Sequence, residues 1–358
     1  MMMNKKIMKM AVMPFMILAA SSLMQSCIEE EFPTDYATGE QMQTAKNPGK
    51  ILLNGLNAKM VEQFSYNGAQ VAYDWGYPSQ MLIRDILGGD EPVSNVTNDY
   101  LAWIADGTSL NVFSLYTYSY YYDLVSNANN MVEKFGSDDS DQKAYAGAAR
   151  AYRALAYLDM SRMFEYKTTG FSSLDAQAEN NKVAGLTVPI VTEKTTAKES
   201  KNNPRAPFYT MYRFILNDLK LAESEMKGFE RANKTQPDES VVYGLEARLW
   251  LEMATRFEKN PEDLATQLAH EEDADGYAKL GVTTADECYA KAAEYAQKAM
   301  ALDGYAPLSS DEWHNEKTGF NLATGAWMWS ASMQDKDMLT YYWYSWLCWM
   351  GSEAPNLT

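Results

Sequence analysis

The pattern of apolar and polar positions along the chain predicts a mostly helical protein. Apolar residues recur at helical spacing in three segments of its first half, at about residues 52–64, 77–87 and 116–135. Glycines follow the second and third segments, where a helix is expected to end. Residues 90–98 show no periodicity and contain Pro92, so we expect a loop there.

Four further helices are expected downstream, each with apolar or small residues on one face. The marker positions are Ala144, Ala148, Ala151, Leu155 and Leu158; Tyr212, Ile215, Leu216, Leu219 and Ala222, after Pro207; Val242, Leu245, Leu249 and Met253; and Tyr289, Ala292, Ala293, Ala296 and Met300. Before the fourth helix, Thr284 and Glu287 have the spacing of a capping box.

These four helices correspond as two pairs. The run Ala149-Arg150-Ala151-Tyr152 in the first pair resembles Ala247-Arg248-Leu249-Trp250 in the second. Interlocking of small and large residues between paired helices is typical of tetratricopeptide repeats. Two long segments predicted as loops, residues 165–204 and 259–283, interrupt the strict repeat period. The predicted fold class is therefore mainly α, with tetratricopeptide-like helical pairs and an irregular loop-rich subdomain.

The N-terminus has the form of a bacterial lipoprotein signal. Lysines precede an apolar run over residues 10–24, which is too short for a permanent membrane span. The small residue Ser26 then precedes Cys27, whose thiol would be lipidated, and the acidic run Glu29 to Glu31 follows. We predict a signal peptide over residues 1–26 and a tether over 27–50. The alternative is an ordinary signal peptide with an incidental acidic linker.

The amino-acid composition limits which classes of molecule this protein can bind. The chain of 358 residues carries 31 Lys+Arg against 48 Asp+Glu, a formal net charge of −17, which would repel a nucleic-acid backbone. An apolar fraction of 46% supports a large core. Of the three cysteines, Cys288 lies in a helical pattern and is expected to be a buried free thiol, while its pairing with Cys348 stays open.

Residue patterns for catalysis or for metal binding are hard to find. The two histidines, His270 and His314, are far apart, and no phosphate loop or nucleophile elbow is present. The acidic stretch 271–276 resembles a calcium loop, but Val282 stands where the bidentate Glu is required. No cofactor or metal is expected, and a surface calcium site at Asp138, Asp139 and Asp141 is only a minor alternative to a solvated loop.

Aromatic side chains around the predicted loop suit a sugar-binding protein. A flat ring buries the apolar face of a sugar, while carboxylates, amides and guanidinium groups bind its hydroxyls. The candidate ligand-binding residues are Trp75, Tyr77, Arg84, Asp85, Asp90, Asn98 and Trp103. A second concentration near the C-terminus comprises Trp313, Trp327, Trp329, Tyr341, Trp343 and Trp346. Each aromatic residue taken singly is better explained by core packing, and the dense run 116–122 is interpreted as packing.

The order of these motifs resembles the SusD/RagB family of nutrient-binding lipoproteins. The likeness is carried by residues 148–160, by Leu186-Thr187-Val188-Pro189-Ile190-Val191 with Asn203-Pro204-Arg205, by residues 247–251 and 289–296, and by Asp74-Trp75-Gly76-Tyr77-Pro78 with residues 81–85. The resemblance implies a single SusD-like domain over residues 51–358. Because family members continue further, it also implies that the C-terminal part of such a domain is missing.

The same resemblance implies a function. It predicts a non-catalytic, lipid-anchored protein on the outer face of the outer membrane. Such a protein would capture an oligosaccharide, or a peptide as in RagB-type receptors, and pass it to a TonB-dependent SusC-like transporter. Two other classes stay open from the residues alone. One is a helical-repeat interaction scaffold with no small ligand, and the other is a surface glycosidase.

Overall fold

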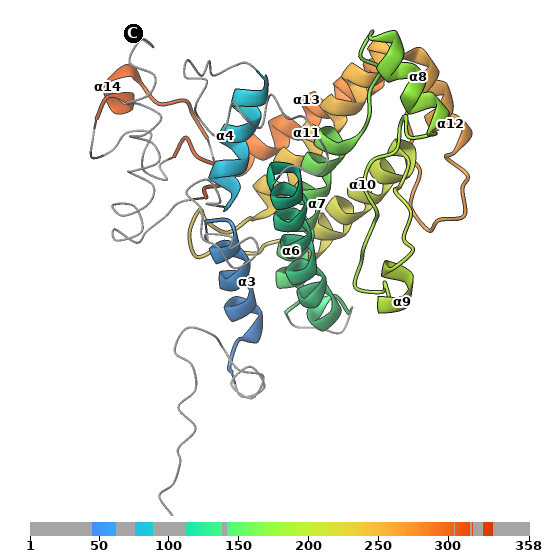
Figure 1. Ribbon diagram of the computed structural model, residues 1–358. Coiled ribbons are helices and arrows are strands. Elements are labelled where there is room, and N and C mark those ends of the chain that lie inside the picture. The colour runs from blue at the N-terminus through green and yellow to red at the C-terminus, as the bar shows by residue number, and fades with distance from the viewer. Residues whose placement is uncertain are drawn as a thin grey trace, which may run out of the picture. The chain divides into compact units, whose positions relative to one another are not determined.

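The computed structural model describes residues 45–61, 76–88, 112–137, 142–303, 305–315, 317 and 325–331. The chain divides into two units, and the helical fold belongs to the second, Gly49–Thr358. Its regular elements in the described ranges are the helices of Figure 1: α3 (Pro48–Lys59), α4 (Gly76–Gly88), α6 (Val112–Phe135), α7 (Lys143–Phe164), α8 (Ser172–Asn180), α9 (Ala197–Ser200), α10 (Phe208–Glu225), α11 (Glu239–Lys259), α12 (Pro261–Ala269), α13 (Ala285–Asp303) and α14 (Ser310–Trp313). The predicted mainly α class is confirmed.

Helix α7 is the centre of the fold. Every residue from Ala146 to Ser161 is buried, and the helix packs against α6, α10 and α11. Small residues allow this close approach: a Cβ added to Gly147 would lie 2.5 Å from Cγ of Met226, just beyond α10. A helix that is covered on all sides must bury its polar residues too, so each charged side chain of α7 needs a partner from a neighbouring helix.

The predicted helical pairs are antiparallel. In the pair α7–α10, Arg150 near the start of α7 contacts Glu225 at the end of α10, with 3.0 Å between Nε and Oε2. In the pair α11–α13, the Tyr289 hydroxyl near the start of α13 donates to Glu258 near the end of α11 at 2.6 Å. The predicted capping box of α13 is present, because Thr284 Oγ1 accepts from the Glu287 N–H at 3.2 Å.

The predicted faces of α10 and α11 are correct, but that of α13 is partly wrong. Of its five marker positions only Ala292 is buried, and Ala293 and Met300 are exposed. The buried stripe is formed by Cys288, Ala292, Tyr295 and Ala299. Alanine occurs on both sides of this helix, so its spacing alone does not identify the inner face. The predicted free thiol is confirmed, and burial raises the pKa of Cys288 to about 11.

The two segments predicted as long loops are only partly irregular. The first contains α8 and α9, and the second contains α12, which begins at Pro261, a favoured first residue of a helix. Residues between α8 and α9 are held by side chains of the central helices. Tyr157 of α7 donates to the Val191 carbonyl at 3.0 Å and accepts from the Val191 N–H at 2.7 Å. Asn129 of α6 donates to the same carbonyl at 3.1 Å.

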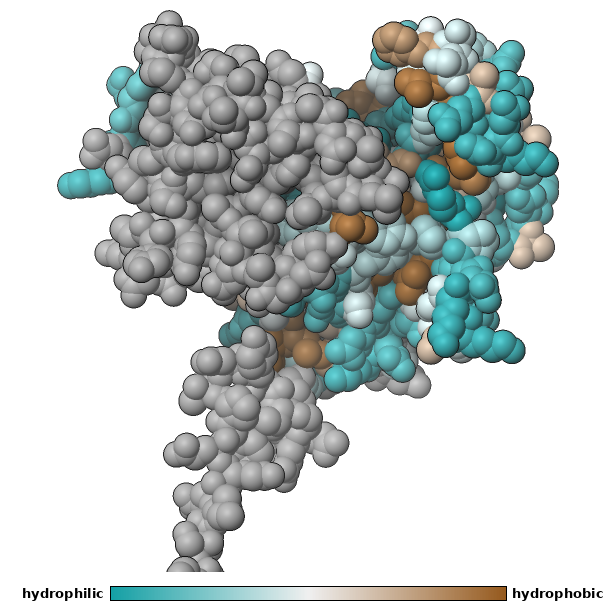
Figure 2. All heavy atoms as spheres, viewed as in Figure 1, coloured by the Kyte–Doolittle hydropathy of each residue, from teal (hydrophilic) through white to brown (hydrophobic). Residues whose placement is uncertain are grey.

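None of the described helices is long and apolar enough to cross a membrane. Figure 2 shows a mainly hydrophilic surface over α8, α9 and α12, with hydrophobic side chains scattered between the polar ones. Scattered apolar residues of this kind are normal on a protein surface.

A buried carboxylate between α10, α11 and α13 makes the stability of the fold depend on pH. Glu246 is 0% exposed, and Nζ of Lys220 lies 3.0 Å from its Oε2. Burial raises the pKa of Glu246 to about 7, against the attraction of Lys220 and with some help from Glu223. Because the pKa is higher in the folded than in the unfolded chain, the stabilising contribution is complete below about pH 4.5 and is lost as the pH rises through 7.

We therefore expect the free energy of unfolding to fall between pH 5 and pH 8 by more in the wild type than in Glu246→Gln. The difference should be on the order of 3 kcal/mol, at about 1.4 kcal/mol for each pH unit between the two pKa values. Urea unfolding at both pH values measures it. The exposed carboxylate Glu262 supplies a control, Glu262→Gln, which should keep the wild-type slope. Equal slopes for Glu246→Gln and the wild type would contradict the prediction.

Candidate functional site

Two adjoining depressions lie on the helical core and share Lys167 and Glu252. The smaller one has a volume of about 510 Å³, and the larger one about 750 Å³. The smaller depression is lined by Met81, Arg84 and Asp85 of α4, Arg162 and Met163 of α7, Lys167, and Arg248 and Glu252 of α11. It brings together two of the ligand-binding residues predicted from the sequence, Arg84 and Asp85.

Helix α4 is fixed to the core through one buried carboxylate, Asp159 of α7, which is 0% exposed. Its oxygen atoms accept hydrogen bonds from Tyr77 Oη at 3.0 Å, Tyr121 Oη at 3.1 Å and Arg248 Nη2 at 3.1 Å. Asp159 also forms an ion pair with Arg84, with 2.9 Å between Nη1 and Oδ1. The four partners come from α4, α6 and α11. Burial, and after it the charge of Asp159, raises the pKa of Tyr77, so its hydroxyl stays protonated and donates. Asp159 therefore positions Arg84 and Arg248, two of the three arginines that line the smaller depression.

Like Asp159, the carboxylate of Glu252, which lines the smaller depression, is shared between two cations. Nε of Arg162 lies 3.2 Å from its Oε2, and Nζ of Lys167 lies 3.1 Å from its Oε1. Both cations are about half exposed, at 51% and 49% of their side-chain surface, whereas Glu252 is 15% exposed. The floor of the depression thus presents charged groups that still face water.

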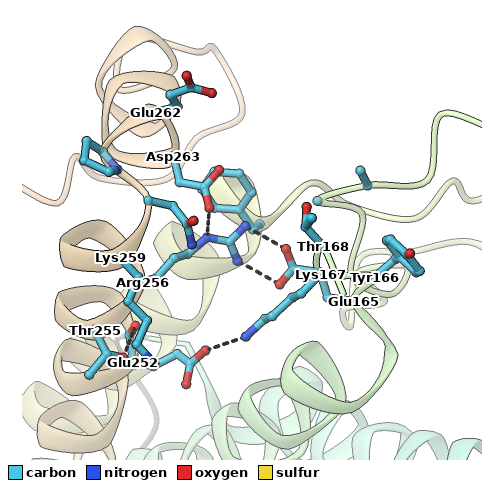
Figure 3. Close-up of a pocket in the computed structure, with 15 residues that line it drawn as sticks. Glu165, Tyr166, Lys167, Thr168, Glu252, Thr255, Arg256, Lys259, Glu262 and Asp263 are labelled. Carbon is cyan, nitrogen blue, oxygen red and sulfur yellow. Dashed lines mark hydrogen bonds and ion pairs between the residues drawn. The ribbon is translucent and has the colours of Figure 1, made fainter. Parts of the chain in front are cut away.

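The larger depression is organised around Arg256, as Figure 3 shows. Its guanidinium group donates to both oxygens of Glu165, at 2.8 and 2.7 Å, and to Asp263 at 2.8 Å, while Lys167 points across the depression to Glu252. The same group lies 3.7 Å from the centroid of the Phe208 ring. These contacts join α11 to α12 and to the end of α7, so Arg256 has its carboxylate partners inside the fold.

The structure places three of the seven predicted ligand-binding residues. Tyr77 is half-buried and hydrogen-bonded to Asp159, Arg84 is half-buried beside it, and Asp85 is exposed at the smaller depression. The other four, Trp75, Asp90, Asn98 and Trp103, lie outside the described residues, as does the predicted lipidation site Cys27. The assignment of all seven to ligand binding stays a prediction.

The second aromatic concentration is divided. Trp329 packs edge-on against Tyr152, with 4.9 Å between ring centroids, and its indole N–H donates to the Thr235 carbonyl at 3.0 Å. Trp313 on α14 is 54% exposed. The predicted packing role of the tyrosine-rich run is confirmed at Tyr116, Tyr120 and Tyr121, which are buried, whereas Tyr118 is exposed.

The acidic stretch with a partial calcium-loop pattern serves as an ion-pair partner. Asp275 accepts two hydrogen bonds from the fully buried Arg213, one of them at 3.0 Å from Nη1, and Val282 is buried in the core. His270 stacks on Tyr209, with 3.9 Å between centroids, and Nδ1 lies 2.8 Å from Asp273. Within the described ranges no three His, Cys, Asp or Glu side chains are placed to hold a metal ion.

Sequence reasoning did not identify Arg162, Lys167 and Arg248 as site residues. Arg248 stands in a repeat motif, and the other two lie at and beyond the end of the preceding repeat helix. One signal was present: Arg248 and Glu252 are four residues apart on one helix, so they share a face. Nothing in the sequence joins that face to α4.

No family model and no curated protein matches this sequence. The chain superimposes on a SusD-like carbohydrate binding protein from Bacteroides vulgatus ATCC 8482 with a TM-score of 0.53 and 18% identity. That match covers 78% of this chain and 49% of the other. This chain has the SusD-like fold. The fold that the sequence motifs implied is thereby confirmed, and the chain spans about half the length of the protein it matches.

Two further neighbours have lower scores and add no separate argument. A SusD superfamily protein from Parabacteroides distasonis ATCC 8503 gives a TM-score of 0.47 at 18% identity and covers 74% of this chain and 46% of its own. A SusD superfamily protein from Bacteroides thetaiotaomicron VPI-5482 gives 0.44 at 16% identity, with 75% of this chain and 49% of its own.

If Asp159 holds the SusD-like core and the depression together, Asp159→Asn should destabilise the protein strongly. The substitution removes the charged acceptor that two partly exposed arginines and two tyrosine hydroxyls share, and the loss of such charge-assisted contacts costs roughly 2–3 kcal/mol. Urea unfolding measures the loss. Glu294→Gln, which removes a carboxylate from exposed pairs on α13, should change stability by no more than about 0.5 kcal/mol. Equal effects of the two substitutions would contradict the role of Asp159.

Proposed function

We propose that this chain belongs to the SusD/RagB family and is a surface nutrient-binding lipoprotein. In this proposal it captures oligosaccharides and delivers them to a TonB-dependent SusC-like transporter. The observation that carries the proposal is the SusD-like fold together with an open polar depression that contains Arg84 and Asp85. The neighbour with the TM-score of 0.53 is itself a carbohydrate binding protein, which supports a sugar as the ligand.

The smaller depression has the chemistry that a sugar needs. Arg84 and Arg248 supply N–H donors, and Asp85 and Glu252 supply acceptors for hydroxyl groups. Met81, which is 48% exposed, and the half-buried Met163 supply apolar surface of the kind that packs on the C–H face of a sugar ring. A volume of about 510 Å³ lies within the usual range of small-ligand pockets.

In the proposed function, the protein binds its ligand without catalysing a reaction. Hydrogen-bonding and packing contacts explain the residues that line the depression, and none of them needs a catalytic role. Incubation with a panel of polysaccharides should therefore produce no new reducing ends. Their appearance, and their loss in Asp85→Asn, would instead favour a surface glycosidase.

Binding by the whole 358-residue chain can be measured by isothermal titration calorimetry against a panel of oligosaccharides. For whichever member binds, Asp85→Asn should weaken the affinity by about 1 kcal/mol, because it removes one charged acceptor from the exposed rim. Asp85 is the better choice for this test than Arg84, since Arg84 also supports the buried Asp159. Asp286→Asn, an exposed Asp on α13 outside the depression, is the matched control. Binding of no oligosaccharide would overturn the proposed function.

The proposed anchor is tested separately. Metabolic labelling with a palmitate analogue should tag the wild type and Cys288→Ala, whose thiol is buried in the core, but not Cys27→Ala. Replacing Glu29 to Glu31 with Ala should keep the label but reduce protease accessibility on whole cells. Unchanged labelling of Cys27→Ala would contradict the lipoprotein assignment, and unchanged accessibility would make the acidic run a simple linker. Copurification of a SusC-like transporter with the tagged protein tests the partner.

A further inference from the structure

The smaller depression has a local excess of positive charge in a strongly acidic protein. Four of its eight lining residues are cations, Arg84, Arg162, Lys167 and Arg248, and only two are acids, Asp85 and Glu252. The chain as a whole has a formal charge of −17. The cluster of cations therefore has the opposite charge to that of the protein as a whole.

The carboxylates around the depression do not neutralise these cations. Buried Asp159 is shared by Arg84 and Arg248, at 2.9 and 3.1 Å, and Glu252 is shared by Arg162 and Lys167, at 3.2 and 3.1 Å. Each of these two acids thus serves two cations. Counting Asp85 as well, three carboxylates face four positive charges, and one positive charge is left over.

In the larger depression, by contrast, the main ion pairs join elements of the fold. There one cation, Arg256, is held by two carboxylates, Glu165 and Asp263, and its side chain is only 8% exposed. All three of its guanidinium nitrogens donate to carboxylate oxygens. An ion pair that only joins elements of a fold has this form, because a buried charge must be compensated completely.

The cations of the smaller depression instead keep hydrogen-bond donors available. Arg162 uses Nε and Arg248 uses Nη2 for their ion pairs, and the part of the chain that the structure describes supplies no acceptor for their other guanidinium nitrogens. Their side chains are 51% and 41% exposed, so these N–H groups face water. Guanidinium groups with free, solvent-facing N–H pairs are well suited to bind planar or tetrahedral oxyanions.

We propose that the smaller depression binds the acidic group of an anionic oligosaccharide, a carboxylate or a sulfate, through Arg162, Lys167 and Arg248. This inference rests on the proposed sugar-binding function and specifies its ligand class. Arg162 and Arg248 donate to the oxyanion with their free guanidinium nitrogens, and Lys167 adds an ammonium charge. Asp85 and Glu252 accept from neighbouring hydroxyls, and the same two acids disfavour a bare polyanion without hydroxyls.

The position of Asp159 gives this site its rigidity. The buried carboxylate holds Arg84 and Arg248 in place before a ligand binds. Binding an anion therefore costs less side-chain conformational entropy. Because the rest of the protein is negative, the attraction is local, and it should weaken with added salt as charges at the surface are screened.

Matched ligand pairs test the proposal with the full 358-residue chain. One pair is an oligogalacturonate and its fully methyl-esterified form, and the other is a chondroitin sulfate oligosaccharide and its desulfated form. Within at least one pair the more anionic member should bind about tenfold more tightly at low salt, and the difference should shrink at about 0.5 M NaCl. Preference within the first pair identifies a carboxylate, and preference within the second identifies a sulfate.

Charge-neutralising variants assign the preference to this depression. Arg162→Gln and Lys167→Gln should each weaken binding of the more anionic ligand about tenfold, since charge-assisted hydrogen bonds are lost. Neither substitution should change the affinity for the uncharged, fully methyl-esterified oligogalacturonate. Lys291→Gln is the matched control, because Lys291 is 43% exposed and also lies 3.1 Å from a carboxylate, Glu294. Melting temperatures of all three variants verify that they are folded.

The outcomes separate this inference from the proposed function. Equal binding of both members of each pair, or wild-type affinity of Arg162→Gln and Lys167→Gln for the anionic ligand, would overturn the anionic-ligand site and leave sugar binding intact. An equal loss in Lys291→Gln would also overturn it, since the effect would then reflect total charge. Failure of every oligosaccharide to bind would overturn both the site and the proposed function.

Discussion

The fold depends on the complete burial of one helix that carries charged residues. Helix α7 is covered by α6, α10 and α11, yet it contains Arg150, Arg153 and Asp159. Arg153 donates to both oxygens of Asp218 on α10, at 2.7 and 2.8 Å, and to Asn129 of α6 at 2.6 Å. A buried charge without such partners would cost several kcal/mol, so the neighbouring helices can dock only in the register that supplies them.

The same constraint builds the candidate site. Asp159 lies near the other end of α7 and binds side chains of α4, α6 and α11, so the need to compensate one buried carboxylate fixes two arginines at the surface. Beside them Glu252 holds Arg162 and Lys167. The charged residues of the buried helix α7 therefore shape both the interior of the helical core, through Arg153, and the depression, through Asp159. Small changes in the packing of α7 would alter both.

Much of the helical core could be predicted from the sequence because its signals are local. The spacing of Leu245, Leu249 and Met253 marks the inner face of α11, and Thr284 with Glu287 marks the start of α13. Alanine gave a poorer signal, since it tolerates either environment, and the exposed Ala293 illustrates the error. Helices within the two long connections were missed, because they are short and their apolar positions are few.

The sequence by itself determined the mainly α class, the repeat-like pairing and the resemblance to SusD-like proteins. Helical periodicity, capping residues and the order of motifs can all be recognised in the sequence without knowing how the helices pack. It also placed Arg84 and Asp85 beside each other on one helix. Only the tertiary structure decided that Arg162, Lys167 and Arg248 join them. These residues come from segments far apart in the chain, and the partners that orient them are the buried Asp159 and the shared Glu252. This grouping depends on how the helices pack against one another, which a local sequence pattern does not predict.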